Sequence, residues 1–136
     1  MNVFNTFVEI APDCPVQTAA IPPQRGDKPT IAQIEYELLT GHPYGLTLEE
    51  LKFEVHLRHK GIAAQGDEER GALWGALFAK PHACMRASPL TKQYGWGAHY
   101  NAAGKIALFP VEGEEYRRLA GDPALEHCLA MRSKRG

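Results

Sequence analysis

The spacing of apolar residues in the first half of the chain predicts its regular elements. Residues 3–10 are rich in β-branched and aromatic side chains and predict a strand. Thr30 and Gln33 form a capping-box pattern ahead of apolar positions three and four apart, which predicts a helix. A second capping-box pattern begins at Thr47. Residues 51–57 then alternate between apolar and polar side chains, so we expect a half-buried strand there.

The next stretch contains a helix signal followed by weaker ones. Residues 67–80 carry acidic side chains in their first turn and an apolar stripe after them, which together predict a helix. Pro81 ends this pattern. We expect a short strand at residues 84–87 and a loop at residues 89–95.

The last third of the chain predicts a hairpin and one or two further elements. Residues 96–100 and 105–111 flank a four-residue turn that ends in Gly104, a pattern typical of a β-hairpin. Residues 114–120 predict a short helix. Residues 124–131 are apolar enough for a last helix or a last strand, and their pattern does not choose between the two.

This order of elements indicates the fold class. Strands near the beginning, the middle and the end, with helices between them, predict an α+β fold with an antiparallel sheet and helices packed mainly on one face. The length fits a single domain over residues 1–136. Residues 11–29 are rich in proline and predict a long loop, which can serve as a lid or a binding loop. Residues 132–136 form a basic tail.

Composition and charge narrow the partners. The chain has 15 Lys and Arg and 16 Asp and Glu, for a net charge of −1, and this balance weighs against a nucleic-acid partner. The three cysteines include no close pair, so no disulfide framework is expected. No cofactor or metal motif is found, and none is predicted. Without a signal peptide or an apolar run of about 18 residues, the expected location is cytoplasmic, with no membrane contact. The oligomeric state is left open.

The densest mixture of functional side chains lies in residues 86–100. Two cations, a hydroxyl, two aromatic rings and an imidazole occur there beside flexible glycines: Arg86, Ser88, Lys92, Tyr94, Trp96 and His99. Cations and aromatic rings together favour a site for a small anionic ligand or a protein partner, and this is the first hypothesis for the function. The alternative interpretation of the same segment is a tight turn whose tryptophan fills the core.

Two other hypotheses remain open. His99 can serve as an acid or base, because an unperturbed imidazole titrates near neutrality, although no nucleophile or carboxylate stands beside it in the sequence. Whether the protein is an enzyme is therefore undecided. Nucleic-acid binding would use Arg86, Lys92 and the basic tail. His56 and His59 would point to opposite faces of the expected strand, so they do not predict a metal site.

Seven strings also resemble a known family. They are NTF at residues 5–7, APDCP at 11–15, YELL at 36–39, FEV at 53–55, RASPLTK at 86–92, YGWG at 94–97 and AMRSKR at 130–135. These strings resemble the small, mainly microbial proteins grouped as domain of unknown function (DUF) 6157. The resemblance extends over essentially the whole chain and implies one domain. It implies no activity, cofactor or catalytic residue.

Overall fold

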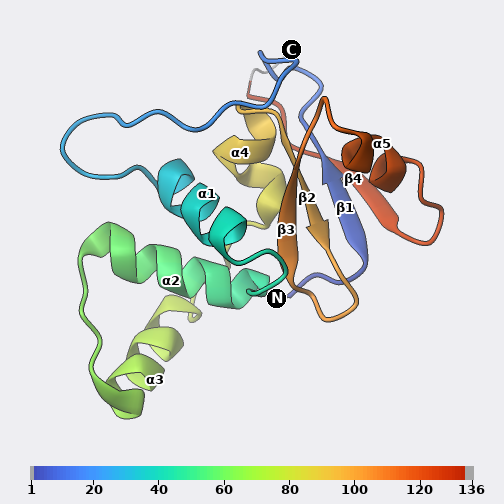
Figure 1. Cartoon of the computed structure of the whole chain (residues 1–136). Coiled ribbons are helices and arrows are strands. Elements are labelled where there is room, and N and C mark those ends of the chain that lie inside the picture. The colour runs from blue at the N-terminus through green and yellow to red at the C-terminus, as the bar shows by residue number, and fades with distance from the viewer. Residues whose placement is uncertain (1, 134–136) are drawn as a thin grey trace.

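The computed structural model describes residues 2–133 and contains a four-stranded sheet with helices on both faces (Figure 1). The strands are β1 (Thr6–Glu9), β2 (Trp96–Tyr100), β3 (Ile106–Pro110) and β4 (Glu126–Leu129). The helices are α1 (Ile31–Gly41), α2 (Leu48–Lys60), α3 (Gly66–Leu77), α4 (Pro89–Lys92) and α5 (Glu114–Ala120), with a 3-10 turn η1 (Met85–Ala87) before α4. Residues 134–136 of the predicted basic tail lie outside the described residues. No helix within residues 2–133 has the length and apolar character needed to cross a membrane.

The α+β class is confirmed, but the sheet is mixed. Its order is β3-β2-β1-β4. Phe7 of β1 lies opposite His99 of antiparallel β2 and opposite His127 of parallel β4. The expectation of a purely antiparallel sheet is therefore wrong. Because β3 and β4 run in the same direction, the chain between them must cross a face of the sheet, and α5 makes this crossing.

The two faces of the sheet bury different clusters. On one face, Val8, Tyr100 and Ile106 belong to the larger cluster, which includes side chains of α1, α2 and α4. On the other face, Phe7 packs against Tyr116 of α5. Figure 1 shows α5 on the opposite side of the sheet from α1 and α4. Most helical packing is thus on one face, as the sequence predicts.

The expected strand at residues 51–57 is wrong, because α2 covers this segment. Leu51 and Val55, four residues apart, join the larger core cluster. Phe53 lies on another side of the helix, against the ring of Trp74 in α3, at 5.1 Å between centroids. Leu57 is also buried. A helix buried on two sides places apolar residues at alternate positions, and this mimics the period of a strand.

Local capping signals determine where the first two helices begin. The Thr30 hydroxyl accepts from the Gln33 backbone N–H, and the Gln33 side chain accepts from the Thr30 N–H. Thr47 and Glu50 form the same reciprocal pair at the start of α2. Both predicted capping boxes are confirmed, and they stabilise helix starts whose N–H groups would otherwise lack partners.

Residues 84–95 differ from the prediction. The expected strand at residues 84–87 is wrong, since η1 occupies it, and the expected loop at residues 89–95 contains α4. Ser88 explains the change, because its hydroxyl accepts from the Leu90 N–H and caps α4, with Pro89 in the first helical position.

The elements of the last third follow the sequence closely. The hairpin of β2 and β3 is confirmed, as is α5. Gly104, at the end of the turn, has a φ of +78°, the left-handed conformation that favours glycine. The undecided segment at residues 124–131 contains β4, a strand.

Candidate functional site

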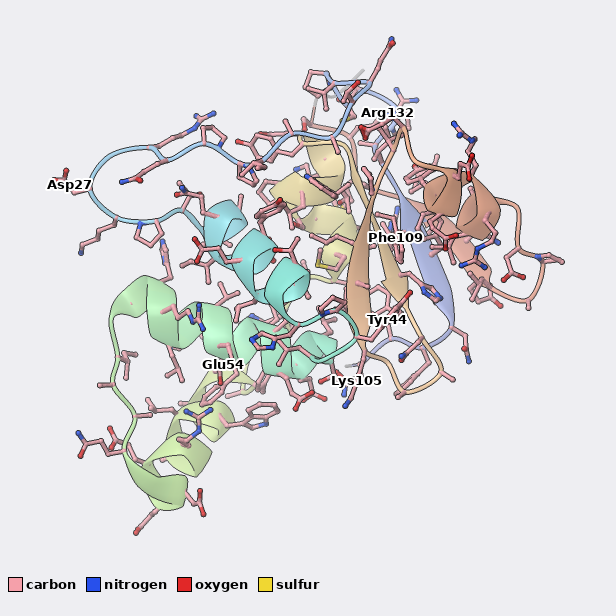
Figure 2. The ribbon with its side chains drawn as sticks, viewed as in Figure 1. Asp27, Tyr44, Glu54, Lys105, Phe109 and Arg132 are labelled. Atoms are coloured by element: carbon pink, nitrogen blue, oxygen red, sulfur yellow. The ribbon has the colours of Figure 1, made fainter. Side chains whose placement is uncertain are left out.

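The sequence-predicted site residues do not gather at one place. Arg86 lies at the outer edge of β4, where its Nε donates to the Leu129 carbonyl at 2.8 Å. The Arg86 carbonyl also accepts from the Met131 N–H at 2.8 Å. These contacts attach the edge strand to η1. Lys92 is half-buried at the end of α4. Arg132, the first tail residue, lies near the top of the view in Figure 2, apart from Tyr44, the residue that contacts His99.

Trp96 and its flanking glycines anchor the long loop at residues 11–29. The Trp96 Nε1–H donates to the Ala20 carbonyl at 2.8 Å, and the Ala20 N–H donates to the Tyr94 carbonyl at 2.9 Å. Gly95 has a φ of +80°, and a Cβ there would lie 3.0 Å from Val16. The aromatic and glycine pattern therefore has a structural explanation, the close approach of the loop to the sheet.

Trp96→Phe is expected to loosen this loop while keeping most of the buried ring. The variant loses the hydrogen bond to the Ala20 carbonyl, and its free energy of unfolding should fall by about 1 kcal/mol. Hydrogen exchange at the Ala20 amide should become faster, and exchange at Gly104, in the distant hairpin turn, should change less. Unchanged exchange at Ala20 would show that the indole N–H does not hold the loop.

His99 lies on the sheet face that α5 covers, away from the other candidates. Its Nδ1 is 2.8 Å from the hydroxyl of Tyr44. The backbone of Tyr44 has a φ of +55°. The Nε2 of His99 is buried and has no hydrogen-bond partner. Burial lowers the pKa of His99, and the charge of Arg118 lowers it further. These effects favour the neutral imidazole. The acid–base hypothesis for His99 stays a prediction.

Ser88 leads to a group that the sequence analysis missed. Its hydroxyl donates to Oε1 of Glu35 at 2.8 Å, and both residues are buried, at 4% and 2% exposure. Burial raises the pKa of the Glu35 carboxyl, while the Ser88 hydrogen bond and the charge of Lys52 partly offset this. A carboxyl in the apolar face of a helix is uncommon unless paired, because the charged form loses its hydration.

Glu35 lines a cleft between α1, α2, the end of α3 and the segment that follows it. The cleft has a volume of about 290 Å³. Besides Glu35, its polar lining is Lys52, His56, His59, Lys60 and His82, and we call it the His–Lys cleft. Its apolar walls are Ile31, Val55 and Leu77.

The helical conformation of α2 brings most of these side chains together. His56, His59 and Lys60 follow Lys52 by four, seven and eight residues. This spacing places the four side chains along one face of the helix. The strand expected from the sequence would have separated the two histidines. His82 is oriented by its Nε2–H, which donates to the Leu77 carbonyl at 2.7 Å.

The basic surface continues past the end of α2. A second cleft of about 230 Å³ shares His59 and Lys60 with the first. It adds Lys28 and Arg58. Within residues 2–133, no three histidine, cysteine or acidic side chains are placed to hold a metal ion together. The arrangement can instead hold an anion through ammonium, guanidinium and imidazole N–H groups.

Comparison with known proteins adds a family to this geometry. The model of DUF6157, a family of unknown function, matches residues 1–136. The predicted resemblance is thereby confirmed. No curated protein and no solved structure matches the chain.

Proposed function

We propose that this chain, which belongs to the DUF6157 family over its whole length, binds a small anionic molecule in the His–Lys cleft. The observation that supports the proposal is the polar lining of the cleft, which has two ammonium groups, three imidazoles and a single carboxyl group. A carboxylate or phosphate group would bind among the nitrogen donors, and the apolar walls would contact the rest of the molecule. The proposal keeps the anionic ligand of the first hypothesis and moves its site from residues 86–100 to α2.

A structural role explains only part of this lining. Cations in the last turn of a helix offset the negative end of its dipole, which accounts for Arg58, His59 and Lys60. Lys52 lies in the middle of α2 and His82 comes from another segment, so the dipole does not explain their convergence. The charge of Lys52 also lowers the pKa of Glu35, against the larger effect of burial.

Glu35 would couple anion binding to a proton. Its Oε1 is taken by the Ser88 hydroxyl, which leaves the second oxygen for a ligand in the cleft. The protonated carboxyl can donate a hydrogen bond to an anion, whereas the ionised carboxylate repels it. Because burial raises the pKa of Glu35, the favourable form persists above the usual pH range of a carboxylic acid. Affinity should therefore fall as the pH rises through that raised pKa.

A titration with two simple anions tests the proposal. Inorganic phosphate and benzoate should shift the amide resonances of Lys52, His56 and His59 in ¹H–¹⁵N spectra. Lys52→Gln should weaken binding by about tenfold, the effect of losing one charge-assisted hydrogen bond.

Lys80→Gln is the matched control, because Lys80 is exposed and does not line the cleft. This variant should bind both anions like the wild type. Equal weakening by the two substitutions, or resonances that do not move with either anion, would contradict the proposal.

A further inference from the structure

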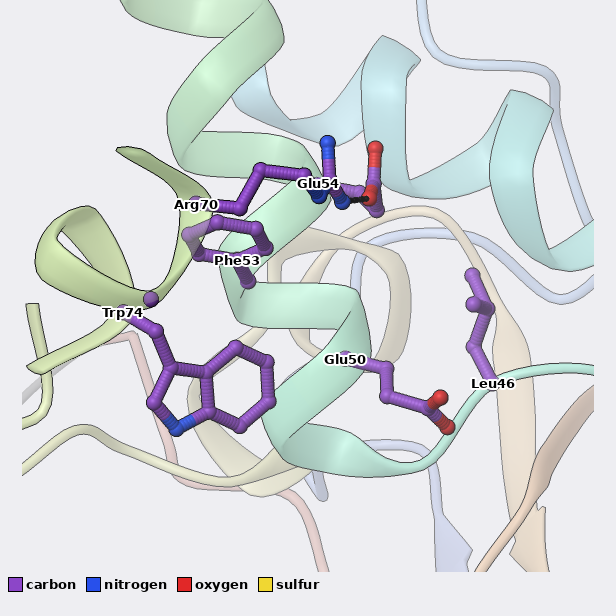
Figure 3. Close-up of a pocket in the computed structure, with 7 residues that line it drawn as sticks. Leu46, Glu50, Phe53, Glu54, Arg70 and Trp74 are labelled. Carbon is purple, nitrogen blue, oxygen red and sulfur yellow. Dashed lines mark hydrogen bonds and ion pairs between the residues drawn. The ribbon is translucent and has the colours of Figure 1, made fainter. Parts of the chain in front are cut away.

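We propose that the cavity between α2 and α3 binds a small organic cation with N–H donors, an alkylammonium or a guanidinium. The cavity measures about 320 Å³, within the usual range for small-molecule sites. Its lining comes from the first half of α2, the middle of α3 and the loop before α2: Leu46, Glu50, Phe53, Glu54, Arg70, Gly71 and Trp74. Figure 3 shows this cavity with the side chains that line it.

The cavity already stabilises one cation of the protein itself. The guanidinium carbon of Arg70 lies 5.1 Å from the centroid of the Phe53 ring. One of its terminal nitrogens is 2.8 Å from Oε1 of Glu54. An aromatic face and a carboxylate are the two groups that bind organic cations most favourably in proteins. Arg70 thus shows which chemistry suits this environment.

A second set of the same two groups is left without a cation. Oε1 of Glu50 accepts from the Thr47 N–H at 2.9 Å, and no other side-chain hydrogen bond engages this carboxylate within residues 2–133. Within residues 2–133, the ion pairs are Arg70 with Glu54 and Arg118 with Glu115, so no cation pairs with Glu50.

Trp74 supplies the aromatic face of this second set. Its indole is held by Phe53 at 5.1 Å and by Phe78 at 4.7 Å between centroids. Figure 3 shows the six-membered ring of the indole on the side toward Glu50. Both side chains line the cavity, so a cation held there would lie near the indole, the ring that attracts cations most strongly, and near a carboxylate.

The charge of the lining selects a cation. Two carboxylates and one guanidinium leave this cavity with a net negative charge. The His–Lys cleft uses Lys52, His56 and His59 of the same helix, whereas this cavity uses Glu50, Phe53 and Glu54. Helix α2 therefore presents opposite charges to its two cavities. The cation site is independent of the proposed anion site, and either can fail without the other.

The test titrates the full chain with 2-phenylethylamine and with 2-phenylethanol, which has nearly the same shape but no charge. The amine should shift the indole N–H resonance of Trp74 and the amide of Gly71, and the alcohol should bind about tenfold more weakly. Inorganic phosphate should leave the Trp74 resonance in place.

Substitutions on α2 separate charge from shape. Glu50→Gln should weaken amine binding by about tenfold, yet it keeps the capping box because a glutamine side chain also accepts from the Thr47 N–H. Glu49→Gln removes the same charge next to the cavity but outside its lining, and it should change affinity less than about twofold. Equal binding of amine and alcohol, unchanged affinity in Glu50→Gln, or a Trp74 resonance that does not move would each overturn the proposal.

Discussion

Alanine at position 97 is expected to destabilise the protein by about 3 kcal/mol or more, the upper range for an overpacked core. A Cβ at Gly97 would lie 2.6 Å from Cε2 of Tyr116 and 2.7 Å from Cζ of Phe7. The two rings pack edge to face at 5.1 Å, and the Tyr116 hydroxyl accepts from the Ile10 N–H at 2.9 Å. Neither ring can move aside without losing one of these contacts.

Urea unfolding of Gly97→Ala measures this loss. Gly75→Ala is the control, because Gly75 lies in α3 with no atom within 4 Å of a Cβ built there. It should stabilise the protein by up to about 1 kcal/mol through helix propensity. If Gly97→Ala unfolds at the same urea concentration as the wild type, the prediction is wrong. The rings of Phe7 and Tyr116 would then be able to move aside at no cost.

The second large effect is expected for Glu35→Gln, which should raise the free energy of unfolding at high pH. Burial raises the pKa of Glu35 from its ordinary value of 4.5. The folded state therefore holds this proton more tightly than the unfolded state. The stability that results is fully present below pH 4.5 and is lost as the pH rises through the raised pKa. Glutamine stays neutral and can still accept from the Ser88 hydroxyl, so it avoids this loss.

We expect Glu35→Gln to exceed the wild type by about 1–3 kcal/mol at pH 8, the range for a poorly solvated buried polar group. The difference should shrink towards pH 4.5. Urea unfolding over this pH range measures it, and Glu37→Gln, exposed on the same helix, should show no such trend. A Glu35→Gln variant that is less stable at pH 8 would instead mean that the ionised carboxylate is held favourably by Lys52. Glu35→Gln should also reduce the pH dependence of anion binding.

The accuracy of the sequence predictions follows how local each signal is. The capping boxes at Thr30 and Thr47 and the turn glycine Gly104 act within a few residues, and all three are found as predicted. The alternation of apolar residues at 51–57 led to the wrong prediction of a strand. It arises because α2 is buried against two different partners, and the sequence does not show these partners. The direction of β4 depends on where α5 crosses the sheet, a long-range property.

The candidate site depended even more on contacts between distant residues. Ser88 was predicted as a ligand residue, but its partner Glu35 comes from a helix more than fifty residues away, and the structure pairs them in the interior. The indole N–H of Trp96 donates to Ala20, in a loop that no local pattern connects to the sheet. Lys52 and His56 join the site only because their segment is a helix.

The position of β1 in the sheet determines the order in which the molecule can assemble. This strand pairs with β2 on one side and with β4 on the other, so both of its neighbours come late in the chain. During synthesis, β1 has no strand to pair with until the hairpin has left the ribosome, and the sheet is complete only after β4 follows. Such non-local pairing slows folding. We therefore expect the helices to form first and the sheet to close as the late, rate-limiting step.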